Sequence, residues 1–443
     1  MTGAVERLMA MVDVEDPCAV PQEELEPLWV QALDDRLQEC RPHIPLLDKL
    51  ATEAGIDTIK ALSDAVPLLF AHTAYKSYPE VFIERGQWDR MNLWLGTLST
   101  ASVADVDVRG VQNADDWLAR LQAAGHYAFA TSGTTGRISV LNQNAADVEF
   151  ANRTMVARKL PKDKTHRIFI LAPRYSPNRM GPTFQHIADV CGRPGAVDFL
   201  TDEPMLITDM SRTARIRKRI ADGVATPSEI ADLESAVAAR GQAGLQWMAD
   251  MMAKILEHRE EPLLIVGLAP QLLMLIQMAR EQGIPDGSFH PDTLLVTGGG
   301  NKGIAVPPDF KEQLIALLGI TEDRFMRGYA MQEISTAAGM NEEGRYEFPA
   351  WIIPLHLDDA GEHLLTDRSG KVSGRMALFD TSISSRWGGI ISGDRVTIDH
   401  DPSPSGRCVP AIVEINRYSD LDGGDDKLTC AGSVESFVRG TVQ

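Results

Sequence analysis

A loop rich in glycine and hydroxyl residues, residues 131–137, carries the first recognisable chemistry. It follows the apolar run 127–130, and such a run before a Gly/Ser/Thr loop predicts a buried strand that ends in a tight turn. Glycine lets the backbone approach an anion, and the hydroxyls add donors for phosphate oxygens. The loop is not a Walker A sequence, because no Gly-Lys-Ser/Thr follows it. The alternative is a polar surface turn; the candidate phosphate-binding residues are Thr131, Ser132, Gly133, Thr134, Thr135 and Gly136.

A second glycine cluster follows the predicted strand 293–297. Its three glycines, Gly298, Gly299 and Gly300, would let a planar ring lie directly on the backbone. Two residues further on, Lys302 supplies one positive charge. Glycine turns after strands are common, so this cluster gains weight only together with the other motifs.

Three further motifs follow in the C-terminal third of the chain. Residues 327–333 read Arg-Gly-Tyr-Ala-Met-Gln-Glu, and residues 388–396 contain a Ser-Gly-Asp turn that ends at Asp394. Arg407 and Arg417 stand in two later segments, 402–408 and 414–417. For the Gly-Asp turn alone, the ordinary reading is a turn that leads into a strand.

In this order, the motifs resemble the signature segments of adenylate-forming enzymes, the superfamily of acyl-CoA ligases, luciferases and acyl-protein synthetases. The similarity is greatest to the LuxE-type acyl-protein synthetase and phenylacetate-CoA ligase branch and covers about residues 125–435. The chain departs from the family pattern at several positions. Ile138-Ser139 stands for Pro-Lys, Asn301 for Trp, Gln332 for Thr, and Ser403 and Ser405 for the cysteines of some relatives.

The resemblance implies a role for each matched residue. Tyr329 would stack on adenine, beside the glycines that begin at Gly298. Gln332 would contact the α-phosphate, and Glu333 would hold Mg²⁺, because a carboxylate beside a triphosphate requires a metal to offset the repulsion. The alternative for Glu333 is a charge that interacts with a helix N-terminus.

The remaining implied roles concern the ribose, the phosphates and the acyl carrier. Asp394 would accept hydrogen bonds from both ribose hydroxyls, Arg417 would lie near ribose and phosphate, and Arg407 is a further candidate for binding the nucleotide. LuxE-type relatives carry the acyl group on a cysteine near the C-terminus, which makes Cys430 the candidate thiol. The alternative for Cys430 is a small buried apolar residue. With Glu333 and Lys302, it completes the predicted catalytic set.

The amino-acid composition limits the classes of protein to which the chain can belong. The chain has 443 residues, is 44% hydrophobic and carries a formal net charge of −19, which disfavours a nucleic-acid partner. The five cysteines (Cys18, Cys40, Cys191, Cys408 and Cys430) show no C-x-x-C spacing, so neither a zinc site nor a disulfide framework is predicted. We find no signal peptide and no apolar stretch of transmembrane length, and therefore expect a cytoplasmic protein.

The pattern of strands and helices predicts an α/β fold. Buried apolar strands at 167–172, 263–268 and 293–297 alternate with helical segments, which favours a mainly parallel sheet. The resemblance implies the large domain of adenylate-forming enzymes, with mixed sheets packed by helices and without the C-terminal lid domain. We expect a mostly helical region at 1–110, an α/β core at 111–417, and a hinge remnant with a short tail at 418–443.

The function implied is ATP-dependent activation of a carboxylic acid to acyl-AMP, followed by transfer to a thiol. The cofactors would be ATP and Mg²⁺, with CoA as one acceptor. Other acceptors are Cys430 or a partner such as an acyl-accepting protein, a carrier protein or a reductase. One alternative is a phenylacetate-type carboxylate-CoA ligase, and another is a non-catalytic nucleotide-binding partner protein. A homodimer is the expected oligomeric state.

Overall fold

The computed structural model describes residues 3–131, 137–157, 160–298 and 306–421. The chain divides into two compact units. The composite unit gathers described residues of 1–131, 137–154 and 332–421. The parallel unit consists of described residues of 155–331.

A sheet of parallel strands forms the centre of the parallel unit. Its spatial order is β5-β4-β6-β7-β8, and every neighbouring pair is parallel. The strands are β4 (His166–Pro173), β5 (Gly192–Thr201), β6 (Leu263–Gly267), β7 (Leu294–Gly298) and β8 (Phe325–Tyr329). Parallel neighbours place their carboxyl ends at the same edge of the sheet, where α/β proteins bind ligands.

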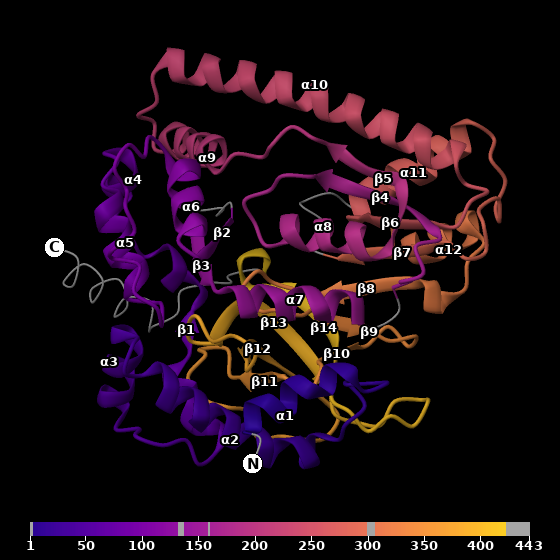
Figure 1. Cartoon of the computed structure of the whole chain (residues 1–443). Helices are drawn as coiled ribbons and strands as arrows, with labels where there is room; N and C mark the ends of the chain where they lie inside the picture. Colours follow the sequence, from indigo (N-terminus) through magenta and orange to yellow (C-terminus); the bar gives the residue numbers. More distant parts are fainter. Residues whose placement is uncertain (1–2, 132–136, 158–159, 299–305, 422–443) are drawn as a thin grey trace. The chain divides into compact units, whose positions relative to one another are not determined.

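Helices connect these strands and cover the sheet. They are α8 (Met180–Cys191), α9 (Ile207–Ala221), α10 (Pro227–Glu257), α11 (Ala269–Glu281), α12 (Phe310–Leu318) and a 3-10 helix, η4 (Glu322–Arg324). Both α8 and α10 contact β4 and β5 (Figure 1). The long helix α10 begins with a capping box: the Thr226 hydroxyl accepts from the Glu229 amide at 3.2 Å, and the Glu229 carboxylate accepts from the Thr226 amide at 2.8 Å.

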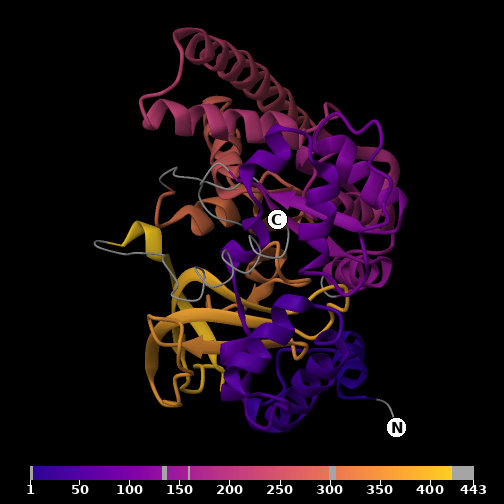
Figure 2. The same cartoon turned by 90° about the vertical axis from the view of Figure 1, so that its left-hand side faces the viewer.

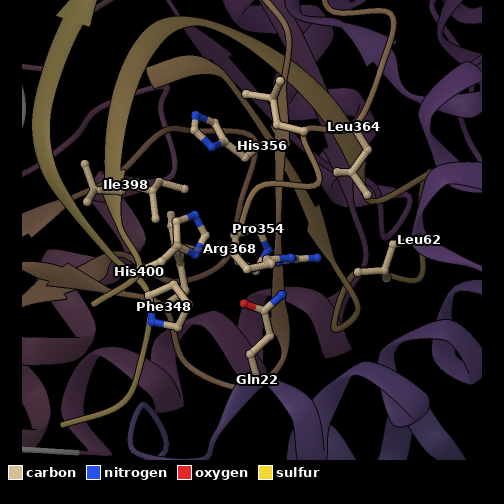
Figure 3. Close-up of a pocket in the computed structure, with 12 residues that line it drawn as sticks. Gln22, Leu62, Phe348, Pro354, His356, Leu364, Arg368, Ile398 and His400 are labelled. Atoms are coloured by element: carbon tan, nitrogen blue, oxygen red, sulfur yellow. The ribbon is translucent and has the colours of Figure 1, made fainter. Parts of the chain in front are cut away.

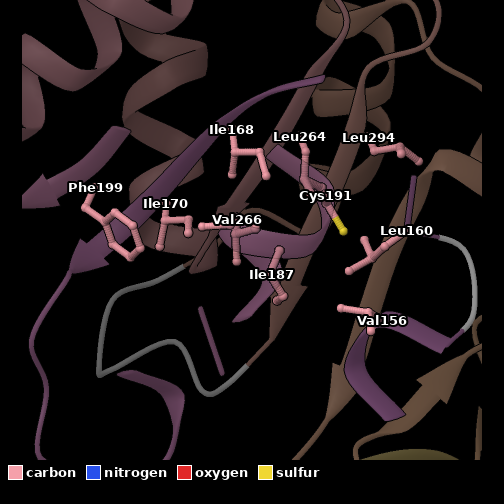
Figure 4. Close-up of a cluster of buried hydrophobic side chains, with 11 residues drawn as sticks. Val156, Leu160, Ile168, Ile170, Ile187, Cys191, Phe199, Leu264, Val266 and Leu294 are labelled. Carbon is pink, nitrogen blue, oxygen red and sulfur yellow. The ribbon is translucent and has the colours of Figure 1, made fainter. Parts of the chain in front are cut away.

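The core of the parallel unit is a hydrophobic cluster between the sheet and α8 (Figure 4). Ile168 and Ile170 of β4 and Ile187 of α8 are completely buried within it. Alternate residues of β4 share one face, so Ile168 and Ile170 point to the same side. Burial of each such side chain contributes about 1.5–3 kcal/mol. This packing fixes the strands whose ends carry the sequence motifs.

A mostly antiparallel sheet forms the centre of the composite unit. Its order is β11-β12-β13-β14-β10-β9, and β1 pairs in parallel with β13 (Figure 2). The strands are β1 (Phe70–Ala71), β9 (Ala338–Met340), β10 (Tyr346–Glu347), β11 (Ile352–Leu357), β12 (Lys371–Asp380), β13 (Gly389–Asp399) and β14 (Ala411–Arg417). A separate antiparallel pair consists of β2 (Tyr127–Thr131) and β3 (Ser139–Gln143).

Short helices supply the rest of the composite unit. They are α1 (Ala4–Ala10), α2 (Gln22–Cys40), α3 (Pro45–Ala54), α4 (Glu80–Glu84), α5 (Trp88–Gly96), α6 (Ala114–Ala123) and most of α7 (Ala145–Ala157), with 3-10 helices η1 (Met11–Asp13), η2 (Leu62–Leu68), η3 (His72–Lys76) and η5 (Tyr418–Asp420). Buried tryptophans anchor several of these segments through their indole N–H groups. Trp29 Nε1, for example, donates to the Ala350 carbonyl oxygen at 2.7 Å.

The predicted fold class is confirmed: the structure is α/β, with mixed sheet strands packed by helices. The expected parallel arrangement holds for β4 to β8, whereas the strands after residue 337 pair in antiparallel fashion. These later strands lie close together in sequence without crossover helices, which antiparallel pairing permits. Within the described residues, no helix has the length and apolar character needed to cross a membrane.

Candidate active site

Several predicted residues fall outside the described part of the chain. These are Ser132, Gly133, Thr134, Thr135 and Gly136 of the hydroxyl-rich loop, Gly299, Gly300 and Lys302 of the second glycine cluster, and Cys430. Thr131 is the last residue of β2, and its backbone pairs with Ser139 of β3. The predicted strand before the loop is therefore confirmed.

Two predicted residues lie at the carboxyl edge of the parallel unit. Gly298 ends β7 and pairs with Gly328 of β8, which ends one residue later at Tyr329. A Cβ atom on Gly298 would lie 3.3 Å from the Gly328 carbonyl oxygen, so the two strands approach closely here. Tyr329 is 9% exposed. The structure thus brings Gly298 and Tyr329 to neighbouring strand ends, the edge where parallel sheets bind ligands.

In the composite unit, Asp394 and Arg417 face each other across a strand pair. The register of β13 and β14 places the two residues opposite one another. Arg417 Nε lies 3.6 Å from Asp394 Oδ1, with the Arg417 side chain 69% exposed and the Asp394 side chain 12% exposed. Two residues predicted from separate motifs are therefore direct neighbours, a carboxylate beside a cation that reaches into solvent.

Glu333 lies with Gln332 in a turn that precedes β9. Burial raises the pKa of the Glu333 carboxyl, and the negative charge of Asp394 raises it further. The positive charges of Arg386 and Lys76 oppose these effects, as does a hydrogen bond from the Glu333 backbone amide. Glu333 is therefore a half-buried acid with a raised pKa, whose charge interacts with two cations and a second acid.

Arg386 and Lys76 were not predicted from the sequence. Arg386 is 1% exposed; its Nη1 donates to the Tyr75 hydroxyl at 3.2 Å, and its Nη2 donates to the Glu333 carbonyl oxygen. Lys76 ends η3, next to Tyr75. In the sequence, Arg386 stands between two serines and a Trp-Gly-Gly run. Nothing in this local sequence distinguishes it from an ordinary surface arginine.

Two buried acids hold the segment that carries Arg386. Asp380 accepts from the Ser335 amide at 2.5 Å and from the Ser382 amide at 2.9 Å, which ties the Glu333 turn to the end of β12. Asp147 accepts from the amide and hydroxyl of Ser384 at 2.9 and 3.0 Å. Hydrogen bonds to charged groups contribute about 1.5–3 kcal/mol each. The positions of Glu333 and Arg386 are thus fixed by backbone bonds to carboxylates.

Arg407 is engaged with carboxylates. Its Nε and Nη2 donate to Glu347 at 3.0 and 2.6 Å, and its Nη1 donates to Asp16 at 2.8 Å. A bidentate arginine–carboxylate pair is among the stronger polar contacts in proteins. The predicted contact of Arg407 with a nucleotide stays a prediction; the three bonds to carboxylates use three of its five N–H donors.

The donor set around Glu333 suits a divalent cation with a phosphate group. Mg²⁺ prefers carboxylate and phosphate oxygens, and Glu333 and Asp394 supply two carboxylates close enough to repel each other. A cation between carboxylate and phosphate would remove the cost that burial imposes on Glu333. Arg417, beside Asp394, is an exposed cation that can face an anion. The residues present therefore fit a metal–nucleotide complex.

Comparisons with known proteins find solved structures of similar fold. No protein-family model and no curated protein matches the sequence. An open conformation of 2-hydroxyisobutyryl-CoA ligase in complex with 2-HIB-AMP and CoA aligns with a TM-score of 0.52 and 14% identity, covering 92% of this chain and 78% of the ligase. The same ligase in the postadenylation state with R3-HIB-AMP gives a TM-score of 0.54 and 14% identity, over 92% and 70% of the two chains. The ligase in complex with 2-HIB-AMP and CoA in the thioesterification state gives a TM-score of 0.53 and 15% identity, covering 90% of this chain and 70% of the ligase. The chain therefore has the fold of the large N-terminal domain of adenylate-forming enzymes.

Proposed function

We propose that the protein activates a carboxylic acid with ATP and passes the acyl group to a thiol. In the first half-reaction a carboxylate oxygen attacks the α-phosphorus of ATP, giving acyl-AMP and pyrophosphate. In the second, the thiol sulfur attacks the acyl carbon, and the products are a thioester, AMP and a proton. The observation that carries the proposal is the group formed by Glu333, Asp394 and Arg417, built on a fold shared with an acyl-CoA ligase.

Each residue of this group has a proposed task. Asp394 would accept hydrogen bonds from the ribose hydroxyls, and Arg417 beside it would face the ribose and phosphates. Mg²⁺, held by Glu333, would neutralise charge on the phosphates. Arg386 would act as a positioning residue, because it bonds the Glu333 carbonyl and is almost completely buried.

The motif residues in the other segments have proposed tasks as well. Tyr329 and Gly298 would receive the adenine ring, and Gln332 would contact the α-phosphate. The hydroxyl-rich loop that begins at Thr131 would bind the pyrophosphate moiety, and Lys302 would oppose negative charge at the α-phosphorus. These assignments rest on the motif resemblance.

CoA is the first acceptor to test, because the structurally similar ligase is known in complex with an acyl-AMP and CoA. The second acceptor is Cys430, as in LuxE-type acyl-protein synthetases, with a carrier protein or a reductase as later partners. The two acceptors predict different products for the same adenylation step.

The experiment compares Cys430→Ser with the wild-type protein, and uses Cys408→Ser, an exposed cysteine, as the matched control. With radiolabelled acid and ATP, self-acylation predicts label on the wild-type and Cys408→Ser proteins and none on Cys430→Ser. Transfer to free CoA predicts equal acyl-CoA formation by all three. If no acid gives acyl-AMP, pyrophosphate or thioester with any of them, the proposed function is wrong.

A further inference from the structure

The pairing of β12 with β13 is irregular at the Ser-Gly-Asp turn. The two neighbours of Met376 in β12 pair with positions 395 and 391 of β13, so Met376 faces three residues, 392–394, where a regular ladder has one. Such bulges re-aim side chains and are frequent beside functional sites. This bulge contains Asp394, which keeps its pairing with Arg417 of β14 on the other side.

Bonds from β12 hold the bulge in place. Arg375 Nη1 donates to the Ser392 carbonyl oxygen at 3.1 Å. The Ser392 hydroxyl donates to the Met376 carbonyl oxygen at 2.7 Å and accepts from the Asp394 amide at 3.1 Å. Arg375 is 1% exposed and Ser392 is 4% exposed. Because buried backbone groups need a partner, the guanidinium supplies a donor that the bulge takes away from the ladder.

The same guanidinium contacts the residue that follows Arg417. The Arg375 Cζ atom lies 3.8 Å from the centre of the Tyr418 ring, within the range of a cation–π contact. The Tyr418 hydroxyl donates to the Asp359 carboxylate at 2.6 Å, and Arg375 Nε donates to the Asp359 carbonyl oxygen at 3.1 Å. Tyr418 is 6% exposed. Its ring and its hydroxyl are therefore both held, and with them the end of β14.

The pair of Asp394 and Arg417 does not fix its own geometry. The Arg417 side chain is 69% exposed and its Nε lies 3.6 Å from Asp394 Oδ1. An exposed ion pair of this kind contributes little, and a long side chain keeps much of its rotamer freedom. The separation of the two residues must therefore come from their backbone, which Arg375 contacts at Ser392 on one side and next to Tyr418 on the other.

A ligand in a neighbouring cavity does not explain the buried guanidinium. The composite unit has a small cavity whose walls include His356, Ile398 and His400 (Figure 3). Neither Arg375 nor Tyr418 lines this cavity. The described contacts of the Arg375 guanidinium instead lead to the two strands that carry Asp394 and Arg417.

We propose that Arg375 is a positioning residue for the ribose of ATP, a role that rests on the proposed function above. It holds Asp394 and Arg417 at a fixed separation, through the bulge and through the Tyr418 ring. A planar guanidinium bonds a carbonyl oxygen with its edge and stacks on a ring with its face, which the ammonium group of lysine does not do. Without Arg375, the bulge and the end of β14 would move independently, and Asp394 would no longer meet both ribose hydroxyls.

The first readout is the ratio of the Kd for 2′,3′-dideoxy-ATP to the Kd for ATP, measured by calorimetry with Mg²⁺ and without acid. In the wild type we expect a ratio of at least about ten, because the dideoxy analogue lacks both donors to Asp394. Arg375→Lys should bring this ratio close to one, whereas the exposed control Arg109→Lys should keep it. A smaller folded fraction changes the number of binding sites and leaves the ratio intact.

Tyr418 provides a second pair of variants, which does not depend on the folding of Arg375→Lys. Tyr418→Phe loses the bond to Asp359 but keeps a ring over the guanidinium, and Tyr418→Leu loses both. We expect Tyr418→Leu to lower the ratio as Arg375→Lys does, and Tyr418→Phe to retain most of it. A Tyr418→Leu protein with the wild-type ratio would overturn the positioning role.

Hydrogen exchange without nucleotide separates this inference from the proposed function. We expect the amides of residues 392–395 to exchange at least about tenfold faster in Tyr418→Leu than in Tyr418→Phe. Equal exchange in the two variants would overturn the claim that the Arg375 contact holds the bulge. A wild-type ratio close to one, together with faster exchange in Tyr418→Leu, would instead refute the ribose task of Asp394 and confirm the structural link.

Discussion

The Nη2 atom of Arg386 lies 2.5 Å from the backbone oxygen of Glu333, and it joins two segments 53 residues apart in the sequence. The same guanidinium reaches Tyr75, which adjoins Lys76. Arg386 thus connects the turn that carries Glu333 with the segment that carries Lys76. The proposed metal–nucleotide group depends on this connection.

The first prediction concerns Arg386→Met. It removes the donors to the Glu333 carbonyl oxygen and to the Tyr75 hydroxyl, which keeps its own bond to the Trp387 carbonyl oxygen. We expect a loss of about 2–4 kcal/mol in the free energy of unfolding, measured with urea, and a slower acid-dependent ATP–pyrophosphate exchange. Arg109→Met, at an exposed arginine paired with Asp107, is the control and should leave both unchanged. Wild-type exchange by Arg386→Met would contradict the positioning role.

The second prediction concerns Glu333→Gln and pH. Because burial raises the pKa of this acid above its ordinary value of 4.5, the folded state holds the proton more tightly than the unfolded state. The stability that this proton contributes is present below pH 4.5 and is lost as pH rises through the raised pKa. Without ligand, Glu333→Gln should therefore match the wild type at pH 4 and be more stable at pH 7.5.

The same variant should adenylate slowly, because an amide is a poor ligand for Mg²⁺. We expect the rate of exchange to fall at least about tenfold. Urea unfolding at pH 4 and pH 7.5 tests the expected change in stability. ATP–pyrophosphate exchange at saturating Mg²⁺ tests the expected loss of adenylation. A Glu333→Gln protein that is less stable at pH 7.5, or that exchanges at the wild-type rate, would remove Glu333 from the proposed metal site.

The third prediction concerns Asp394→Ala. Loss of a charged acceptor for ribose should weaken ATP binding by about 1.5–3 kcal/mol, roughly 10- to 100-fold in Kd. Asp420→Ala is the control, since Asp420 is exposed and its carboxylate accepts from the adjacent Ser419 hydroxyl. Calorimetric titration with a non-hydrolysable ATP analogue measures the Kd of both variants and of the wild type. Equal affinities for ATP would place the ribose elsewhere.

The fourth prediction compares two glycines of the composite unit. A Cβ atom on Gly388 would lie 2.2 Å from the Asp380 carbonyl oxygen, a distance that backbone atoms cannot accept without movement. We expect Gly388→Ala to cost about 3–4 kcal/mol of unfolding free energy. Gly339→Ala meets no atom within 4 Å and should cost less than about 1 kcal/mol. Similar costs for the two would show that the segment beside Arg386 is not held by Asp380.

Local patterns in the sequence were sufficient for much of the fold. The apolar strands predicted at 167–172, 263–268 and 293–297 appear as β4, β6 and β7. Short apolar runs of this kind are local properties of the sequence. The antiparallel pairing of β11 to β14 could not be predicted in the same way, because it depends on contacts between distant residues.

The candidate site was predicted only in part, for a related reason. Asp394 and Arg417 stand in recognisable motifs, and the strand register brings them together as neighbours. Arg386 and Lys76 carry no motif and join Glu333 only through tertiary structure. The buried acids Asp147 and Asp380, which hold the Arg386 segment, look like ordinary surface residues in the sequence. Whether a single charged residue is buried, and which residue it pairs with, cannot be read from the residues beside it in the sequence.

The most direct test of the central claim is ATP–pyrophosphate exchange with Mg²⁺ across fatty, aryl and hydroxy acids. The proposed function predicts exchange that depends on one class of acid and is lost in Glu333→Ala. Exchange with no acid of the panel, while ATP still binds, would contradict activation and favour a non-catalytic nucleotide-binding protein.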